Sequence, residues 1–285
     1  MSAIASIVFD GAARLGSGPH PERARQDAET LLLHVLAKNK AWLMAHGDEP
    51  LDDKSALSYA ELLERRYQGE PVQYITGETE FYGLPFHVTR DVLIPRPETE
   101  HLVEKILELA AHFEQPRIVD IGTGSGCIAV TLAHQLPHAQ ITAIDFSAPA
   151  LKIAHENARL NGVALRFLEG DLLAPVAAEK FDFVVSNPPY VPATDRATLS
   201  VEVRDFEPAL ALFSGDDGLE VYRRLIPSAF NALAPGGFLL LEIGYGQSPA
   251  ITDLLAFSGF QQIEFVPDLQ GIPRVACAQR LSEAA

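Results

Sequence analysis

The chain has 285 residues, of which 47% are hydrophobic, and it carries a formal net charge of −16. This length suits one large domain or two ordinary ones. The acidic balance is compatible with a basic protein partner, but it argues against capture of nucleic acid by a basic surface, so we expect no stable nucleic-acid complex.

The sequence gives no indication of a membrane span, a signal peptide or a cysteine-based metal site. No run approaches the roughly 18 apolar residues of a membrane span, and residues 1–15 have neither the basic nor the long apolar region of a signal peptide. The two cysteines, Cys127 and Cys277, lie far apart and fit no metal-binding spacing. We therefore expect a cytoplasmic protein, which we take to be a monomer without membrane attachment or bound metal.

Residues 1–72 are predicted to form a small helical bundle. Pro21 opens one helix with an apolar stripe, and a second helix runs over 53–67 and ends before Gly69 and Pro71. This region contains no chemical motif. It is either purely structural or a surface on which a protein partner docks.

Residues 73–95 contain two short strand candidates, which predict a β-hairpin that links two domains. The stretch Leu-Ile-Pro-Arg-Pro-Glu-Thr-Glu follows at 93–100. Pro97 can start a helix, with Glu98 and Glu100 in its first turn, where carboxylates favour the helix dipole. Helix capping thus explains the acidic residues but not the stiff Pro-Arg-Pro entrance.

The third segment, residues 96–285, alternates between strand and helix patterns. Strands are predicted near 117–121, 140–144, 164–168, 182–186, 237–242, 260–265 and 273–279. Helices are predicted near 126–135, 147–160, 218–234 and 247–257. Such alternation predicts an α/β domain with a mostly parallel, seven-stranded sheet and helices on both faces. The last two strands are joined by too short a link for a helical crossover, so the last strand should be antiparallel.

The first strand of this domain ends in a glycine-rich turn. Gly122, Thr123, Gly124, Ser125 and Gly126 give the spacing G-x-G-x-G. Glycines let the backbone turn sharply and approach a ligand closely. The spacing differs from the G-x-G-x-x-G of dinucleotide sites, and no Gly-Lys-Ser/Thr of a phosphate loop follows. The turn therefore favours a ligand without a pyrophosphate group.

Two acidic residues follow the next strands. Asp145 ends the second strand and could accept both hydroxyls of a ribose, although an exposed acid at a strand end is the simpler alternative. Asp171 and Leu172 follow the third strand and could hold the amino edge and the face of an adenine, or merely form a turn. Together with the glycines, they describe a nucleoside with a small tail that is not a phosphate.

The fourth strand, an apolar run over 181–185, stops at Ser-Asn-Pro-Pro-Tyr. Pro188 and Pro189 forbid both strand and helix, so Asn187 is held at a strand end, where ligands bind in open α/β sheets. An amide oxygen and a nearby backbone carbonyl can accept the protons of an NH2 group. The alternative is a proline-rich turn with Asn187 as a local cap.

These motifs give the chain a family resemblance. Asp-Ile-Gly-Thr-Gly-Ser-Gly, the position of Asp145 and Asn-Pro-Pro-Tyr resemble class I S-adenosylmethionine-dependent methyltransferases, whose fold is Rossmann-like. More closely, the chain resembles the release-factor glutamine N5-methyltransferases. The matching stretches are G-E-P-V-Q-Y-I-T-G (69–77), L-I-P-R-P-E-T-E (93–100), D-I-G-T-G-S-G-C-I-A (120–129), S-N-P-P-Y-V (186–191) and F-E-P-A-L-A-L (206–212).

The resemblance implies transfer of a methyl group from S-adenosyl-L-methionine, leaving S-adenosyl-L-homocysteine, to the Gly-Gly-Gln glutamine of class I peptide chain release factors. The Asn187 amide oxygen and the Pro188 carbonyl would accept the two N–H bonds of that glutamine. Tyr190 would stack on the flat amide or wall the pocket, with plain packing as the alternative, and Pro189 and Phe81 would form further walls of the substrate site. The helical residues 1–72 would hold the release factor. The cofactor-binding residues implied are Gly122, Thr123, Gly124, Ser125, Gly126, Asp145, Asp171, Leu172 and Asn187.

Other functions fit parts of this pattern. Asn-Pro-Pro-Tyr also suits an adenine-N6 methyltransferase acting on DNA or RNA, but the acidic charge counts against it. A ribosomal-protein glutamine methyltransferase is a near relative, but the Pro-Arg-Pro-Glu-Thr-Glu stretch resembles the release-factor branch instead. A nucleotide-binding module without catalysis is a third alternative, which the intact Asn187 and glycine turn disfavour.

Overall fold

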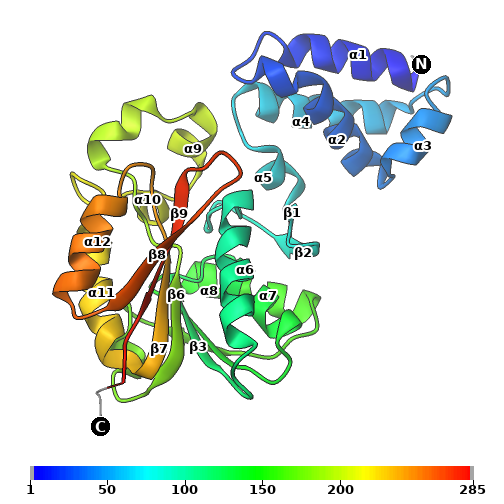
Figure 1. Cartoon of the computed structure of the whole chain (residues 1–285). Helices are drawn as coiled ribbons and strands as arrows, with labels where there is room; N and C mark the ends of the chain where they lie inside the picture. The colour runs from blue at the N-terminus through cyan, green and yellow to red at the C-terminus, as the bar shows by residue number, and fades with distance from the viewer. Residues whose placement is uncertain (1–2, 283–285) are drawn as a thin grey trace. The chain divides into compact units, whose positions relative to one another are not determined.

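The structure is a computed structural model that describes residues 3–282 (Figure 1). Two compact units are present. The helical unit comprises the chain up to Glu78 together with Leu199–Phe206, and the sheet unit comprises Thr79–Thr198 and the chain from Glu207 onward. The sequence predicted boundaries at 72 and 95. The division instead falls after Glu78, and a short distant segment belongs to the helical unit.

The helical unit is a bundle, built around a core that includes Leu31, Leu32, Tyr59 and Leu63. Its helices are α1 (Ile4–Leu15), α2 (Ala24–Leu36), α3 (Lys40–Ala45), α4 (Asp53–Tyr67), α5 (Val72–Thr76) and α9 (Val201–Phe206). The sequence predicted the bundle, and a 3-10 turn at Pro21–Arg23 starts the helix expected there.

Helix α9 is held within the helical unit by a buried ion cluster. The Arg66 guanidinium is 2% exposed, and its Nε donates to Asp27 Oδ2 at 2.6 Å. Its Nη1 contacts Glu202 of α9, 136 residues away in sequence, and donates to the Glu70 carbonyl at 3.1 Å. Gly69 has φ +93°, and a Cβ there would approach the Val201 side chain to 2.5 Å. A glycine is therefore needed where α9 packs.

The sheet unit contains the β-hairpin and the seven-stranded sheet. The hairpin pairs β1 (Glu78–Phe81) with β2 (Leu84–His87). The large sheet has the order β5-β4-β3-β6-β7-β9-β8. Its strands are β3 (Arg117–Ile121), β4 (Gln140–Asp145), β5 (Arg166–Glu169), β6 (Phe181–Ser186), β7 (Leu233–Glu242), β8 (Gln261–Pro267) and β9 (Pro273–Gln279). All seven strands predicted along the sequence are thus present as strands of one sheet.

Strand direction also follows the prediction. The pairs β3·β4, β3·β6, β4·β5 and β6·β7 are parallel, whereas β9 runs antiparallel to both β7 and β8. The short link between β8 and β9 allows only an antiparallel return. What the sequence did not predict is that the last strand lies between β7 and β8, because the order of pairing depends on distant contacts.

Alternate residues of the strands point into two cores, one on each face of the sheet. Helices α6 (Glu100–Ala110), α7 (Cys127–Gln135) and α8 (Ala148–Leu160) contribute to one core, and α11 (Glu220–Ala232) and α12 (Ser248–Phe257) contribute to the other (Figure 1). The short α10 (Ala209–Leu212) lies near the carboxyl ends of the strands. Helices on both faces explain why the central residues of the parallel strands β3, β4 and β6 are mostly apolar and buried.

No helix among residues 3–282 is long and apolar enough to cross a membrane. Within the same residues, no group of three or more His, Cys, Asp and Glu side chains could hold a metal ion.

Candidate active site

The candidate site lies at the point where the order of the strands reverses. Strand β3 is central; β4 pairs on one side of it and β6 on the other, with Ile121 opposite Ser186. The loops after β3 and β6 therefore leave the sheet side by side and diverge, which opens a crevice at the carboxyl ends of the strands. The Ser186 hydroxyl donates to the Ile121 carbonyl at 2.7 Å and ties the two strand ends together.

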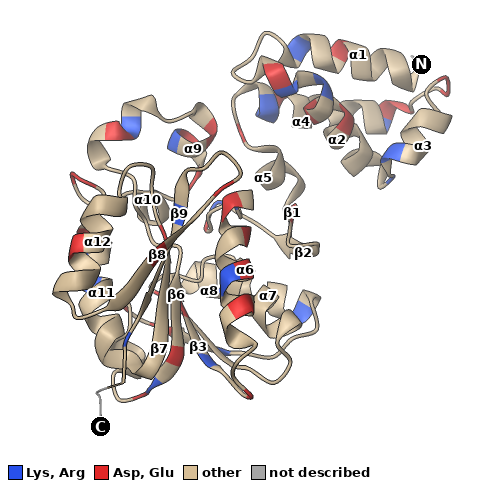
Figure 2. Ribbon diagram, viewed as in Figure 1, with Lys and Arg blue, Asp and Glu red and all other residues tan. Residues whose placement is uncertain are grey.

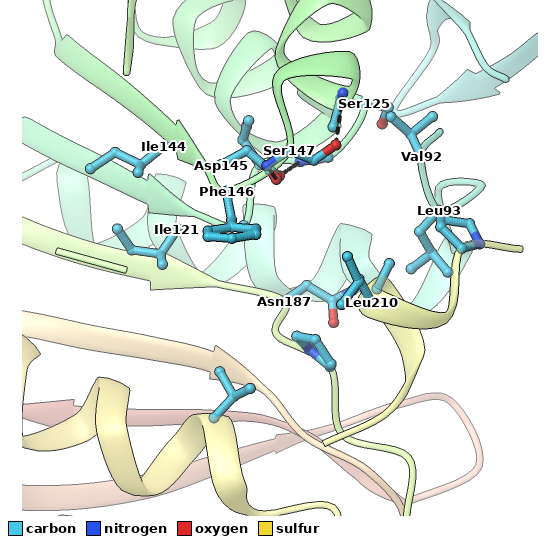
Figure 3. A pocket seen from close by; sticks show the side chains of 18 of the residues that line it. Val92, Leu93, Ile121, Ser125, Ile144, Asp145, Phe146, Ser147, Asn187 and Leu210 are labelled. Carbon is cyan, nitrogen blue, oxygen red and sulfur yellow. Dashed lines mark hydrogen bonds between the residues drawn. The ribbon is translucent and has the colours of Figure 1, made fainter. Parts of the chain in front are cut away.

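A cavity of about 390 Å³ lies at this crevice, within the range of small-molecule sites. Figure 3 shows side chains from several strand ends and loops that line it. The apolar lining includes Val92, Leu93, Ile121, Ile144, Phe146 and Leu210. The polar lining includes Thr123, Ser125, Asp145, Ser147, Asp171 and Asn187. Apolar walls with a few polar groups suit a flat ring attached to a hydroxyl-bearing part.

The glycine turn has the left-handed backbone that its sequence requires. Gly122, Gly124 and Gly126 have φ values of +69°, +55° and +80°. Gly122 and Gly124 line the cavity, and a Cβ at Gly122 would meet no atom within 4 Å. Gly126 does not line the cavity; a Cβ there would press on Ala154 at 3.1 Å. Gly126 thus allows α7 to pack closely on α8.

Asp145 is oriented by the glycine turn itself. Its two carboxylate oxygens accept from the backbone N–H groups of Gly124, at 2.8 Å, and Ser147, at 2.9 Å. Figure 3 shows Asp145 and Ser147 side by side at the cavity. Burial raises the pKa of Asp145, although these two hydrogen bonds act in the opposite direction. Each carboxylate oxygen can accept a further hydrogen bond, so a ribose diol fits here.

Two neighbouring positions are consistent with a bound nucleoside. Leu172, a non-glycine residue, has φ +51°, a strained conformation that is often found at ligand sites. Both Leu172 and Asp171 line the cavity, and Asp171 forms an ion pair with Arg224. Below the glycine turn, Asp120 Oδ1 is buried without a hydrogen-bond partner in the described part of the chain. An amine or water donor would complete this site.

Asn187 faces the cavity from the end of β6, as the sequence predicted. Its Nδ2 donates to the Thr99 hydroxyl at 3.1 Å, and that hydroxyl donates to Glu242 Oε2 at 2.6 Å. Glu242 ends β7 and is 2% exposed. Burial raises its pKa from 4.5 to about 7, and the hydrogen bonds from Thr99 and Tyr190 oppose that shift. Sequence reasoning missed Thr99 and Glu242.

The Pro-Arg-Pro entrance is explained by an ion pair. Arg96 lines the cavity and its Nη2 lies 2.5 Å from Glu207 Oε2. The two segments that carry these residues, 93–100 and 206–212, are thereby joined across 111 positions of sequence. The prolines on each side of Arg96 limit its backbone, which holds the guanidinium at the rim.

Comparison with known proteins places the chain. Two family profiles match: the methyltransferase small domain over residues 98–209 and the PrmC N-terminal domain over residues 11–77. The release factor glutamine methyltransferase of Koribacter versatilis is 41% identical over 95% of this chain and 97% of that protein. The corresponding protein of Moorella thermoacetica is 44% identical over 92% and 93%. The chain belongs to the release factor glutamine methyltransferase family.

Solved structures agree on the fold. The hMettl16 catalytic domain in complex with the MAT2A 3′UTR hairpin 1 gives a TM-score of 0.58 at 17% identity, over 88% of this chain and 91% of that one. The T. thermophilus 16S rRNA N2 G1207 methyltransferase, in complex with AdoMet and guanosine, gives 0.52 at 19% identity, over 71% and 49%. At these identities the likeness shows a Rossmann-like methyltransferase fold alone.

Three residues expected at the substrate side of this methyltransferase site do not line the cavity. Phe81 is 2% exposed and packs edge to face on Phe86 in the core, so the structure gives it a packing position. Pro188 is buried, whereas Pro189 lines the cavity. Tyr190 packs on the core of the sheet unit, and its hydroxyl lies 3.3 Å from Glu242 Oε1 rather than facing the cavity.

Proposed function

We propose that this chain transfers a methyl group from S-adenosyl-L-methionine to the side-chain nitrogen of the Gly-Gly-Gln glutamine in class I peptide chain release factors. Family membership supports the reaction, and one feature of the site carries the assignment to a planar NH2 group. Because the Asn187 Nδ2 donates to Thr99, and no hydrogen bond to its Oδ1 is formed among residues 3–282, the oxygen is the end of the amide that can accept from a substrate. A free amide oxygen at the cavity accepts an N–H of the substrate.

The residues of the cavity fit S-adenosyl-L-methionine, which supplies an electrophilic methyl group when bound. Asp145 would accept the ribose hydroxyls, and the open backbone of Gly122 and Gly124 would admit the tail. Asp171 and Leu172 lie where they would contact the base. The absence of a phosphate-binding sequence agrees with a ligand whose tail carries a sulfonium and no phosphate.

The enzyme has to make the glutamine amide nitrogen, a poor nucleophile, react with the methyl group. The lone pair of an amide nitrogen is delocalised into its carbonyl, so positioning has to supply much of the acceleration. The Asn187 Oδ1 and the Pro188 carbonyl would accept the two N–H bonds and turn the face of the amide toward the methyl group. These acceptors also favour the positive charge that develops on nitrogen during transfer.

The helical unit is proposed to dock the release factor. It carries the exposed apolar side chains of Phe9, Met44 and Leu57, which are 73%, 82% and 69% exposed. A short Gly-Gly-Gln peptide would lack this remote binding energy, which is needed to order a flexible loop in the cavity. Intact release factor should therefore be a far better substrate than the peptide.

The alternatives make different predictions for substrate choice. In the part of the chain that the structure describes, Lys and Arg are interspersed with Asp and Glu in both units rather than gathered in one stripe (Figure 2). Such a distribution offers little for a phosphate backbone. We therefore favour a protein substrate over DNA or RNA.

The decisive assay offers labelled S-adenosyl-L-methionine with four substrates side by side: intact release factor, its loop variant with the glutamine replaced by alanine, adenine-containing DNA, and ribosomal proteins. We expect one labelled glutamine, located by mass spectrometry, in the intact release factor alone. Labelling of the DNA, or equal labelling of the loop variant, would overturn the assignment. Preferred labelling of a ribosomal protein would move it to the neighbouring branch.

A further inference from the structure

Two buried residues behind Asn187, namely Thr99 and Glu242, form a connected hydrogen-bond chain with it. Thr99 is 1% exposed and ends the 3-10 turn Pro97–Thr99 before α6, while Glu242 ends β7. The contacts run from Asn187 Nδ2 to Thr99 Oγ1, at 3.1 Å, and from Thr99 Oγ1 to Glu242 Oε2, at 2.6 Å. Three elements that are distant in sequence thus meet at one amide.

The direction of these hydrogen bonds is determined by chemistry. In its ionised form the Glu242 carboxylate can only accept, so the Thr99 hydroxyl then uses its single proton on Glu242 Oε2. The oxygen of Thr99 then has only lone pairs left for Asn187, and the NH2 end of the Asn187 amide is the end that can donate to them. The Asn187 Oδ1 is consequently directed away from Thr99.

We propose that Thr99 and Glu242 are positioning residues that fix the orientation of the Asn187 amide, so that its oxygen and not its NH2 group faces the substrate. This inference rests on the proposed function, and it extends the site beyond the Asn-Pro-Pro-Tyr segment. An amide turned by 180° would present two N–H donors to the NH2 group of the substrate. Donor would then face donor, and the hydrogen bond that aligns the nucleophile would be lost.

The protein holds Glu242 in place through its own residues, so the orientation of the Asn187 amide does not depend on contact between Glu242 and the substrate. Tyr190 places its hydroxyl 3.3 Å from the other oxygen of Glu242, and the Tyr222 hydroxyl donates to the Glu242 backbone carbonyl at 2.7 Å. Glu242 is thus held at its backbone and on both sides of its carboxyl group. A fixed acceptor is what a directional hydrogen-bond chain requires.

The test compares Thr99→Val with Thr99→Ser. Valine keeps the shape of threonine but removes the hydroxyl, whereas serine keeps the hydroxyl. We expect Thr99→Val to lower kcat about 10- to 100-fold, the cost of a misplaced reacting group, with the KM for release factor and the Kd for S-adenosyl-L-methionine within about twofold. Thr99→Ser should restore most of kcat. The matched control is Thr131→Val, because Thr131 is fully buried and its hydroxyl has no hydrogen-bond partner among residues 3–282.

Two further measurements separate positioning from general damage. In an Asn187→Ala background, Thr99→Val should cause no additional loss, since both changes remove the same interaction. In protein labelled with 15N-asparagine, the Asn187 side-chain NH2 signals should show slowed hydrogen exchange that Thr99→Val abolishes and Thr131→Val does not.

The exchange readout needs no turnover, so it tests the hydrogen-bond chain even if release factor is not the substrate. If the wild-type enzyme transfers no label to release factor, the proposed function is refuted. An active wild type with kcat unchanged in Thr99→Val, additive losses in the double variant, or Asn187 exchange unaffected by Thr99→Val would refute the positioning role.

Discussion

Asp27, a buried carboxyl group of the helical unit, has an arginine partner, as has Glu207 of the sheet unit, whereas Asp120 and Glu242 of the sheet unit accept hydrogen bonds from hydroxyl groups. In the helical unit, Asp27 lies against the Arg66 guanidinium, which also contacts Glu202. In the sheet unit, the hydrogen bonds of Asp120 and Glu242 come from the hydroxyls of Thr123 and of Thr99 and Tyr190. The first arrangement neutralises charge, and the second does not.

The difference indicates what each group is for. A buried ion pair holds distant segments together, here α9 against α2 and α4. A buried carboxyl group with only hydroxyl partners costs stability when it ionises, and such groups gather at functional sites. Asp120 precedes the last residue of β3, which lines the cavity, and Glu242 ends β7 and contacts Thr99, which also lines it. Asp120 and Glu242 thus cost the sheet unit stability when they ionise, whereas the ion pairs of Asp27 and Glu207 do not leave a buried charge unneutralised.

The largest effect is expected from removing the cation of the helical unit. Arg66→Met should lower the free energy of unfolding by about 3–5 kcal/mol, since the buried Asp27 would lose its 2.6 Å hydrogen bond from Arg66 and keep the longer contact to Arg23, at 3.9 Å. Urea denaturation measures this. Arg25→Met is the control, because Arg25 is 85% exposed and its pair with Glu29 should contribute less than about 1 kcal/mol. Equal costs for the two variants would contradict the role given to the buried cluster.

A change at the site should affect rate rather than stability. Asn187→Ala should reduce the single-turnover rate about 10²- to 10³-fold, by analogy with loss of one aimed hydrogen-bonding group at an oxyanion hole. The Kd for S-adenosyl-L-methionine should change little. Asn231→Ala, on the exposed side of α11, is the control. A near-normal single-turnover rate in Asn187→Ala would mean that the amide does not align the substrate.

Features of the fold and the site that depend on neighbouring residues in the sequence could be predicted. The strand-helix alternation, the glycine turn and Asn187 at a strand end depend on neighbouring residues, and the structure contains all three. By contrast, the Arg66–Glu202 and Thr99–Glu242 contacts join residues 136 and 143 positions apart. The spacing of apolar residues in the sequence does not predict contacts between residues so far apart.

One available signal was overlooked. Glu242 is the single carboxylate in the apolar run Phe238–Ile243, and a charge inside a buried strand is a functional candidate in itself. Phe81, which was expected to form a wall of the substrate site, packs in the core of the sheet unit.

A smaller effect is expected for the cofactor. Asp145→Ala should weaken binding of S-adenosyl-L-methionine by about 1.5–3 kcal/mol, the contribution of a hydrogen bond to a charged acceptor. Isothermal titration calorimetry measures the change. Asp145→Asn, which keeps the shape and one acceptor oxygen, should lose less. Unchanged affinity in Asp145→Ala would remove this residue from the cofactor site.

The smallest effect concerns pH and tests the cost of the unneutralised carboxyl groups. Burial raises the pKa of Glu242 from 4.5, and that of Asp120 from 3.8, to about 7 in each case. The charged and titratable groups that act on Glu242 are Glu98, Cys127, Tyr190, Tyr222 and Arg274. Because both folded-state pKa values are raised, the native state binds more protons than the unfolded state between the usual values and pH 7. The free energy of unfolding should therefore fall as pH rises through this window.

Glu242→Gln removes one of the two titrations and leaves a group of the same size that can still accept from Thr99. Its free energy of unfolding, followed by urea denaturation from pH 5 to pH 8 at constant ionic strength, should fall less steeply than that of the wild type. The difference in slope should be about 1 kcal/mol per pH unit within the window, since one pKa unit corresponds to about 1.4 kcal/mol. The variant should therefore gain on the wild type as pH rises. Parallel pH profiles for Glu242→Gln and the wild type would show that Glu242 is ionised in the folded protein without a stability cost, and would remove the contrast between the arginine-paired and the hydroxyl-bonded carboxyl groups.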